Sequence, residues 1–111
     1  MNDLLKKNCE PLVKGTKPLS RTKAEELLKQ VPSWTLDPET KMISREYTFK
    51  DFIGAINFVN TIAELAEEES HHPDITIRYN TVLLELSTHD VGGLSENDFI
   101  LAAKIDASQP K

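Results

Sequence analysis

The chain has 111 residues, 39% of them hydrophobic and 28% charged, which suffices for one hydrophobic core and excludes two ordinary domains. No apolar run approaches the ~20 residues that span a bilayer, and the first twenty residues lack the apolar stretch of a secretory signal. Cys9 is the single cysteine, which excludes an internal disulfide and a multi-cysteine zinc site. We expect one compact cytoplasmic domain.

The net charge of −5 is distributed unevenly. Residues 1–50 carry ten basic and seven acidic groups, whereas residues 51–111 carry three and eleven. A nucleic-acid surface needs a basic stripe, and only two of the four glycines are neighbours, so neither a dinucleotide fingerprint nor a P-loop can form. Direct nucleic-acid binding and nucleotide cofactors are therefore excluded. All three histidines lie in the acidic half: His71, His72 and His89.

In chain order, residues 1–19 have no periodicity and are predicted to be a flexible lead-in, part of which can dock. Thr22 and Glu25 match a capping box, and the apolar spacing behind them predicts a helix over 22–30 that stops before Pro32. Alternating residues on either side of a turn at 37–40 then predict a hairpin of two strands, 34–36 and 43–49.

A wide apolar stripe predicts the longest helix, from Asp51 to about Ser70. Pro73 disfavours helical backbone at His72, so this helix ends at the two adjacent histidines. Alternation over 75–79 and 82–86 predicts a second hairpin with its turn near residues 80–81.

Ser95 and Asp98 then cap a final helix that continues through Ile105. The order α-β-β-α-β-β-α predicts an α+β two-layer sandwich, with a four-stranded antiparallel sheet and three helices on one face. We expect this domain over residues 20–106 and a tail over 107–111.

Two features predict self-association. Residues 82–84 are apolar on both faces of their strand, and the stripe on the long helix is wider than one sheet needs. A second buried surface, and hence a homodimer or homotetramer, is expected.

The histidines are the candidate chemical groups, because imidazole, with an unperturbed pKa of about 6.5, transfers protons near neutrality. If the long helix keeps its geometry through its last turn, Glu67 and His71 share a face and the carboxylate can hold the imidazole. His89 follows the last strand, where a cleft beside a sheet can open. Acidic neighbours favour a protonated ring, so at least one histidine can act as a general acid.

Other interpretations of these residues stay open. The histidines could be idle on the surface, and residues 67–69 a solvated helix end. A zinc site is disfavoured, because adjacent His71 and His72 cannot easily aim at one ion and no His-Glu-x-x-His motif occurs. Trp34 fits core or rim packing, or stacking on a flat ligand.

Four motifs lie along the chain: Glu67-x-x-x-His71-His72-Pro73, Tyr79, Ser87-Thr88-His89-Asp90 and Gly93-Leu94-Ser95-Glu96-Asn97-Asp98. In these motifs, and over about residues 18–106, the sequence resembles the pterin-4a-carbinolamine dehydratase family. The resemblance implies a hydro-lyase that removes water from 4a-hydroxytetrahydropterin to give quinonoid dihydropterin, in tetrahydrobiopterin recycling. It implies no metal or organic cofactor.

By the same resemblance, residues 70–72 and 87–89 line the pterin, with the three histidines catalytic. We assign His71, supported by Glu67, and His89 to the two sides of the reacting carbon, and His72 to anchoring the ring. Asp98 would orient His89 or support its loop. The expected binding set is Glu67, Ser70, His71, His72, Ser87, Thr88 and His89, with Trp34 and Asp98 in support.

Two positions depart from the family pattern: Ser70 stands where animal members commonly have an acidic residue, and Phe99 where Trp is frequent. The resemblance also leaves two other roles open. One is a protein-binding dimerisation cofactor of a homeodomain transcription factor, and the other is a molybdopterin-related role.

Overall fold

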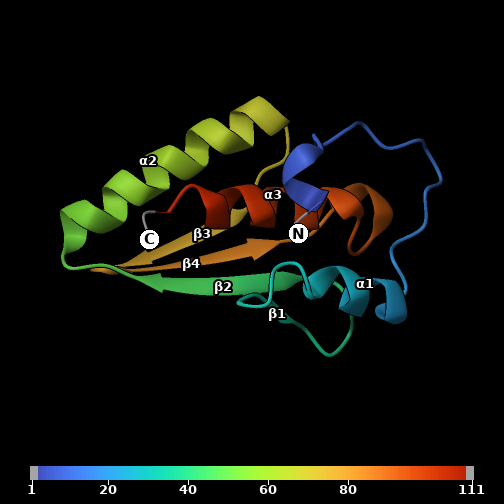
Figure 1. The fold of residues 1–111 in the computed structure, drawn as a ribbon, viewed down its shortest axis with the longest axis horizontal. Coiled ribbons are helices and arrows are strands. Elements are labelled where there is room, and N and C mark those ends of the chain that lie inside the picture. Colours follow the sequence, from blue (N-terminus) through green and yellow to red (C-terminus); the bar gives the residue numbers. More distant parts are fainter. Residues whose placement is uncertain (1–2, 110–111) are drawn as a thin grey trace.

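The computed structural model describes residues 3–109, so the first two residues of the predicted lead-in and the last two of the predicted tail lie outside it. The described chain contains three α-helices and a four-stranded antiparallel sheet in the order α-β-β-α-β-β-α, with two short 3₁₀ helices, η1 (Asp3–Lys6) and η2 (His89–Val91). Helices α2 and α3 lie over one face of the sheet (Figure 1). This confirms the predicted α+β fold.

The sheet has the strand order β1-β2-β4-β3, formed by β1 (Thr35–Leu36), β2 (Ile43–Thr48), β4 (Thr81–Leu86) and β3 (Asp74–Arg78). Along β4 the side chains alternate: Val82, Leu84 and Leu86 are fully buried in the core, while Leu83 and Glu85 face the other side and are half-buried. This period of two places the apolar set under the helices.

Helix α2 (Phe52–Glu69) matches its predicted span. It begins at Asp51, whose Oδ1 accepts a hydrogen bond from the Gly54 amide at 2.8 Å. A Cβ on Gly54 would lie 3.2 Å from that oxygen, so glycine allows the close cap. The helix ends at Ser70, whose backbone is left-handed with φ 53°. This turn takes His71 and His72 off the helical path.

The other two helices differ in how well their starts were predicted. Helix α1 (Arg21–Leu28) is capped by Ser20, whose hydroxyl accepts from the Lys23 amide at 3.2 Å. The predicted cap at Thr22 is therefore wrong, because Ser20 has the extended backbone a cap requires and Thr22 already lies in the first turn. Helix α3 (Glu96–Ala107) has the predicted Ser95–Asp98 capping box.

Trp34 is a core residue and not a ligand platform. It is almost fully buried, and its indole N–H donates to the Asp106 carboxylate at 3.0 Å. Arg45 and Tyr47 donate to the same carboxylate at 2.8 and 2.6 Å. This cluster fastens the end of α3 to β2, and the buried indole has no face available for a flat ligand.

Part of the lead-in packs on the domain, as the sequence allowed. The side chain of Leu4 in η1 is buried, and η1 lies beside α3 (Figure 1). Between residues 3 and 109, no helix combines the length and apolarity needed to cross a membrane.

Candidate functional site

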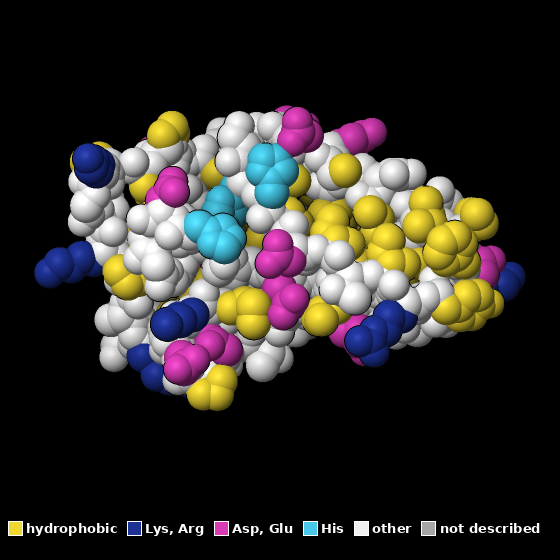
Figure 2. Space-filling view, turned by 180° about the vertical axis from the view of Figure 1, so that it is seen from behind, with side chains coloured by type: hydrophobic (Ala, Val, Ile, Leu, Met, Phe, Trp, Pro, Cys, Tyr) yellow, Lys and Arg dark blue, Asp and Glu magenta, His cyan; other side chains and the backbone are white. Residues whose placement is uncertain are grey.

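An open cleft of about 250 Å³ lies where the segment after α2 meets the segment after β4. Figure 2 shows histidine side chains gathered on one face of the molecule. Two segments far apart in sequence meet here because β3, which starts just after the histidines, pairs with β4, which ends just before His89. The residues that line the cleft are Ser70, His71, His72, Ser87, Thr88, His89 and Asp90. All of the predicted binding set except Glu67 thus lines one cleft.

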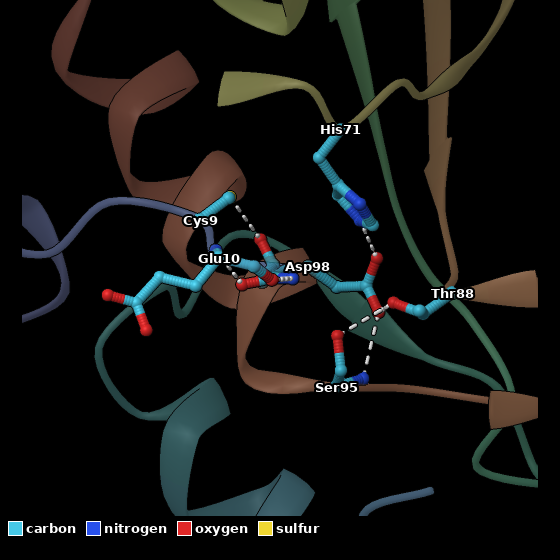
Figure 3. A network of polar contacts seen from close by, with 7 residues as sticks. Cys9, Glu10, His71, Thr88, Ser95 and Asp98 are labelled. Carbon is cyan, nitrogen blue, oxygen red and sulfur yellow. Dashed lines mark hydrogen bonds and ion pairs between the residues drawn. The ribbon is translucent and has the colours of Figure 1, made fainter. Parts of the chain in front are cut away.

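His71 is held by a buried carboxylate. Its Nε2 lies 2.5 Å from Asp98 Oδ1, and the two side chains are 12% and 0% exposed. The other oxygen of Asp98 accepts from the Thr88 hydroxyl at 2.8 Å and from the Ser95 amide at 3.0 Å (Figure 3). An ionised carboxylate only accepts hydrogen bonds, so Nε2 of His71 carries the hydrogen and Nδ1 is the nitrogen left for a bound molecule.

His72 has a second carboxylate partner, Glu67. Its Nε2 lies 2.6 Å from Glu67 Oε2, but this pair is open to solvent, with the side chains 60% and 78% exposed. The predicted pairing of Glu67 with His71 is therefore wrong. The helix ends at Glu69 and Ser70 is left-handed, so the four-residue spacing no longer places His71 above Glu67.

His89 begins η2 directly after β4 and is exposed. Its loop is closed by two backbone hydrogen bonds between Thr88 and Gly93, the shorter of them 2.7 Å, and Gly92 takes the left-handed conformation that the turn requires, with φ 73°. Of the two roles predicted for Asp98, its hydrogen bonds fit support of the loop and not a contact with His89. Asp98 holds His71 and supports the His89 loop through Thr88.

The N-terminal segment forms part of the site that sequence reasoning missed. The Cys9 amide donates to Glu69 Oε1 at 2.7 Å, and the Asn97 side chain clamps the backbone of Glu10. Burial, and then the charge of Glu69, raise the pKa of the Cys9 thiol to about 12, so this thiol is not a nucleophile near neutrality. No spacing rule reveals these contacts, because they are made by the backbone of an aperiodic segment.

The fold and the site together define a class: a small α+β domain whose cleft gathers three imidazoles, two of them paired with carboxylates, which suits acid–base chemistry on a small molecule. The sequence profile described as pterin 4 alpha carbinolamine dehydratase matches residues 17–108. The chain belongs to the pterin-4a-carbinolamine dehydratase family, a family of hydro-lyases, and a pterin substrate follows from this membership.

Relatives assigned to this dehydratase cover nearly the whole chain. A protein from Halorhodospira halophila is 49% identical over 104 residues, which is 94% of this chain and 95% of that protein. One from Nitrosospira multiformis is 43% identical over 106 residues, covering 96% of this chain and 92% of the relative. The similarity therefore extends into the N-terminal segment as well as the histidine cleft.

Solved structures share the fold. A protein from Brucella melitensis described as a transcriptional coactivator/pterin dehydratase has a TM-score of 0.77 and 33% identity, over 82% of this chain and 97% of that one. A pterin dehydratase-like protein identified as a RuBisCO assembly factor in the alpha-carboxysome has a TM-score of 0.58 and 25% identity, over 68% and 87% of the two chains.

Proposed function

We propose that this protein dehydrates 4a-hydroxytetrahydropterin to quinonoid dihydropterin and water by histidine acid–base catalysis, within tetrahydrobiopterin recycling. One observation carries the proposal. Three imidazoles line a single cleft, and the one at its inner wall, His71, is oriented by the fully buried carboxylate of Asp98.

The reaction needs two proton transfers. One proton goes to the 4a-hydroxyl as its bond to carbon breaks, and another leaves the adjacent ring nitrogen as the new double bond forms. His71 follows α2 and His89 follows β4, so two separate segments carry them into the cleft and they can serve the two sides of the reacting carbon. His72, held by Glu67 at the rim, anchors the ring, and Ser87 and Thr88 offer polar groups to its edge.

The test is stopped-flow dehydration of a synthetic 4a-carbinolamine, with the spontaneous rate subtracted. General acid–base assistance contributes about 10²–10⁴-fold, so His71→Ala and His89→Ala should each lower kcat by that order. His72→Ala should act mainly on KM. Glu46→Gln on the exposed part of β2 is the matched control and should keep wild-type rates.

Near wild-type turnover by His71→Ala or His89→Ala would contradict the proposed mechanism. Absence of turnover by the well-folded wild-type protein would remove the dehydratase function. It would favour the protein-binding role instead, which needs no histidine cluster.

We also propose that the protein associates with a second copy of itself. Exposed apolar side chains lie at the start of α2 and on the β3–β4 hairpin, and Figure 2 shows hydrophobic side chains gathered at one end of the molecule. Ile53 and Tyr79 are the most exposed of these, at 63% and 67%. Sedimentation equilibrium should give a multiple of the chain mass that Ile53→Asp lowers. A wild-type mass of one chain at micromolar concentration would contradict this.

A further inference from the structure

A second cavity, of about 320 Å³, adjoins the histidine cleft. The two spaces share four lining residues, Ser70, His71, Thr88 and Asp90, so a molecule in the cleft can extend into the second cavity. Small-molecule sites commonly enclose about 300–1,000 Å³. The cleft alone falls below this range, whereas the cleft and the adjoining cavity together lie within it.

The outer wall of this cavity is the N-terminal segment 9–12. The wall is fixed at two points. Asn97 accepts from the Glu10 amide at 3.1 Å and donates to the Glu10 carbonyl at 2.8 Å, and buried Glu69 accepts from the Cys9 amide at 2.7 Å. A paired clamp of this kind holds the backbone in one position, so the cavity is a formed space and not a gap beneath a loose end.

The charged side chains in the lining of this cavity are acidic. Of the described residues that form it, none is Lys or Arg, whereas four carry carboxylates: Glu10, Glu68, Glu69 and Asp90. The Lys104 ammonium, which does not line the cavity, lies 3.6 Å from Glu69 Oε2 and offsets one of these charges. The carboxylate of Glu10 points away from Asp98 and His71 (Figure 3). Uncharged hydrogen-bonding groups come from Ser70, Thr88 and Asn97.

We infer that this cavity receives the substituent carried by the pterin ring and selects a neutral, hydroxylated chain over a phosphorylated one; the inference rests on the proposed dehydratase function. Hydroxyl groups find donors and acceptors in the lining, whereas a phosphate dianion meets carboxylates and neither Lys nor Arg among the described lining residues. The N-terminal segment is then a specificity-determining part of the site, and Leu12 is one of its wall residues.

The first experiment compares three 4a-carbinolamines at low salt: one with a methyl substituent, one with a dihydroxypropyl chain and one with a phosphorylated hydroxyalkyl chain. The phosphorylated compound should have a kcat/KM on the order of tenfold below that of the dihydroxypropyl compound, because its phosphate and the carboxylates of the cavity repel each other. The difference should shrink at about 0.5 M salt, where charge interactions are screened.

The second experiment places one positive charge in the wall. Leu12→Lys should raise the ratio of phosphorylated to dihydroxypropyl kcat/KM about fivefold, by the same Coulomb reasoning. Val13→Lys adds the same charge at the next residue, which does not line this cavity, and should change the ratio less than about twofold.

The outcomes separate the two proposals. No turnover of any of the three compounds by the wild-type protein overturns the dehydratase function and the inference with it. Turnover of the methyl compound without discrimination against phosphate, or equal effects of Leu12→Lys and Val13→Lys, overturns the cavity assignment and leaves the dehydratase function standing.

Discussion

Two carboxylate–imidazole pairs with nearly the same geometry lie next to each other at one cleft and differ in burial. The Asp98–His71 distance is 2.5 Å and the Glu67–His72 distance is 2.6 Å. The first carboxylate is fully buried and the second is 78% exposed. The substitutions Asp98→Asn and Glu67→Gln each replace a carboxylate by its amide, the first in a buried pair and the second in an exposed pair.

The expected costs follow from the contacts. Asp98 accepts three hydrogen bonds, and a hydrogen bond to a charged group contributes about 1.5–3 kcal/mol. An amide keeps one acceptor oxygen and turns a donor toward groups that also donate, so we expect a loss of about 2–4 kcal/mol in the free energy of unfolding. Solvent-exposed pairs contribute about 0–1 kcal/mol, so Glu67→Gln should cost less than about 0.5 kcal/mol.

Urea unfolding at pH 7 followed by circular dichroism measures the difference. With a slope of about 1–3 kcal/mol per molar urea, Asp98→Asn should lower the midpoint by about 1 M or more. The same variant should lower kcat about 10²-fold, since His71 loses its orienting partner, whereas Glu67→Gln should stay within a few-fold. Equal midpoint shifts for the two variants would refute the reasoning from burial.

Further predictions concern four residues outside the histidine cleft: Asp106, Tyr47, Cys9 and Asp37. Asp106→Ala should lower the free energy of unfolding by about 2–4 kcal/mol because it leaves the buried Trp34 indole and Tyr47 hydroxyl without acceptors. Burial, then the Asp106 hydrogen bond, raise the pKa of Tyr47, so absorbance titration at 295 nm should show this phenol protonated beyond the ordinary tyrosine range. Alkylation of Cys9 at pH 8 should be slow and should accelerate in Asn97→Ala. Because the pKa of the Cys9 thiol is raised to about 12, the protonated thiol contributes fully to the free energy of unfolding below the ordinary thiol pKa. This contribution is lost as the pH rises toward 12. Slight burial opposes the shift at Asp37, but backbone N–H groups, led by that of Met42, lower its pKa. Its contribution is present above the ordinary carboxyl pKa and is lost as pH falls below about 4, so Asp37→Asn should flatten acid unfolding curves there.

Local pattern predicted those parts of the fold that local forces determine. The apolar stripe of α2 and the restriction imposed by Pro73 placed the end of that helix at the histidines, and the Ser95–Asp98 box placed the start of α3. The same reasoning failed at the start of α1, because the Thr22–Glu25 spacing matches a capping box, whereas the residue with the extended backbone of a cap is Ser20.

The partners of the histidines could not be predicted for a different reason. His71 and Asp98 are 27 residues apart, and they meet only because Ser70 turns left-handed and the sheet brings α3 beneath it. Helical spacing extrapolated to His71, two residues past the end of α2, gave the wrong partner. The N-terminal wall was missed because its contacts run from backbone amides to Glu69 and Asn97, and such contacts impose no pattern on the segment's own side chains.

The first turn of α3 carries the helix cap, the carboxylate that holds His71 and the clamp of the N-terminal wall. Asp98 closes the capping box and holds His71, Asn97 clamps Glu10, and Glu96 pairs with Lys7 at 3.0 Å. In a small domain with one core, the amides at a helix start must be satisfied in any case. The Asp98 carboxylate caps the helix and also accepts a hydrogen bond from the His71 imidazole. His71 is thus fixed without an additional buried charge. Any change that frays this turn should therefore loosen His71 and the N-terminal wall together, so stability and selectivity should decline in parallel.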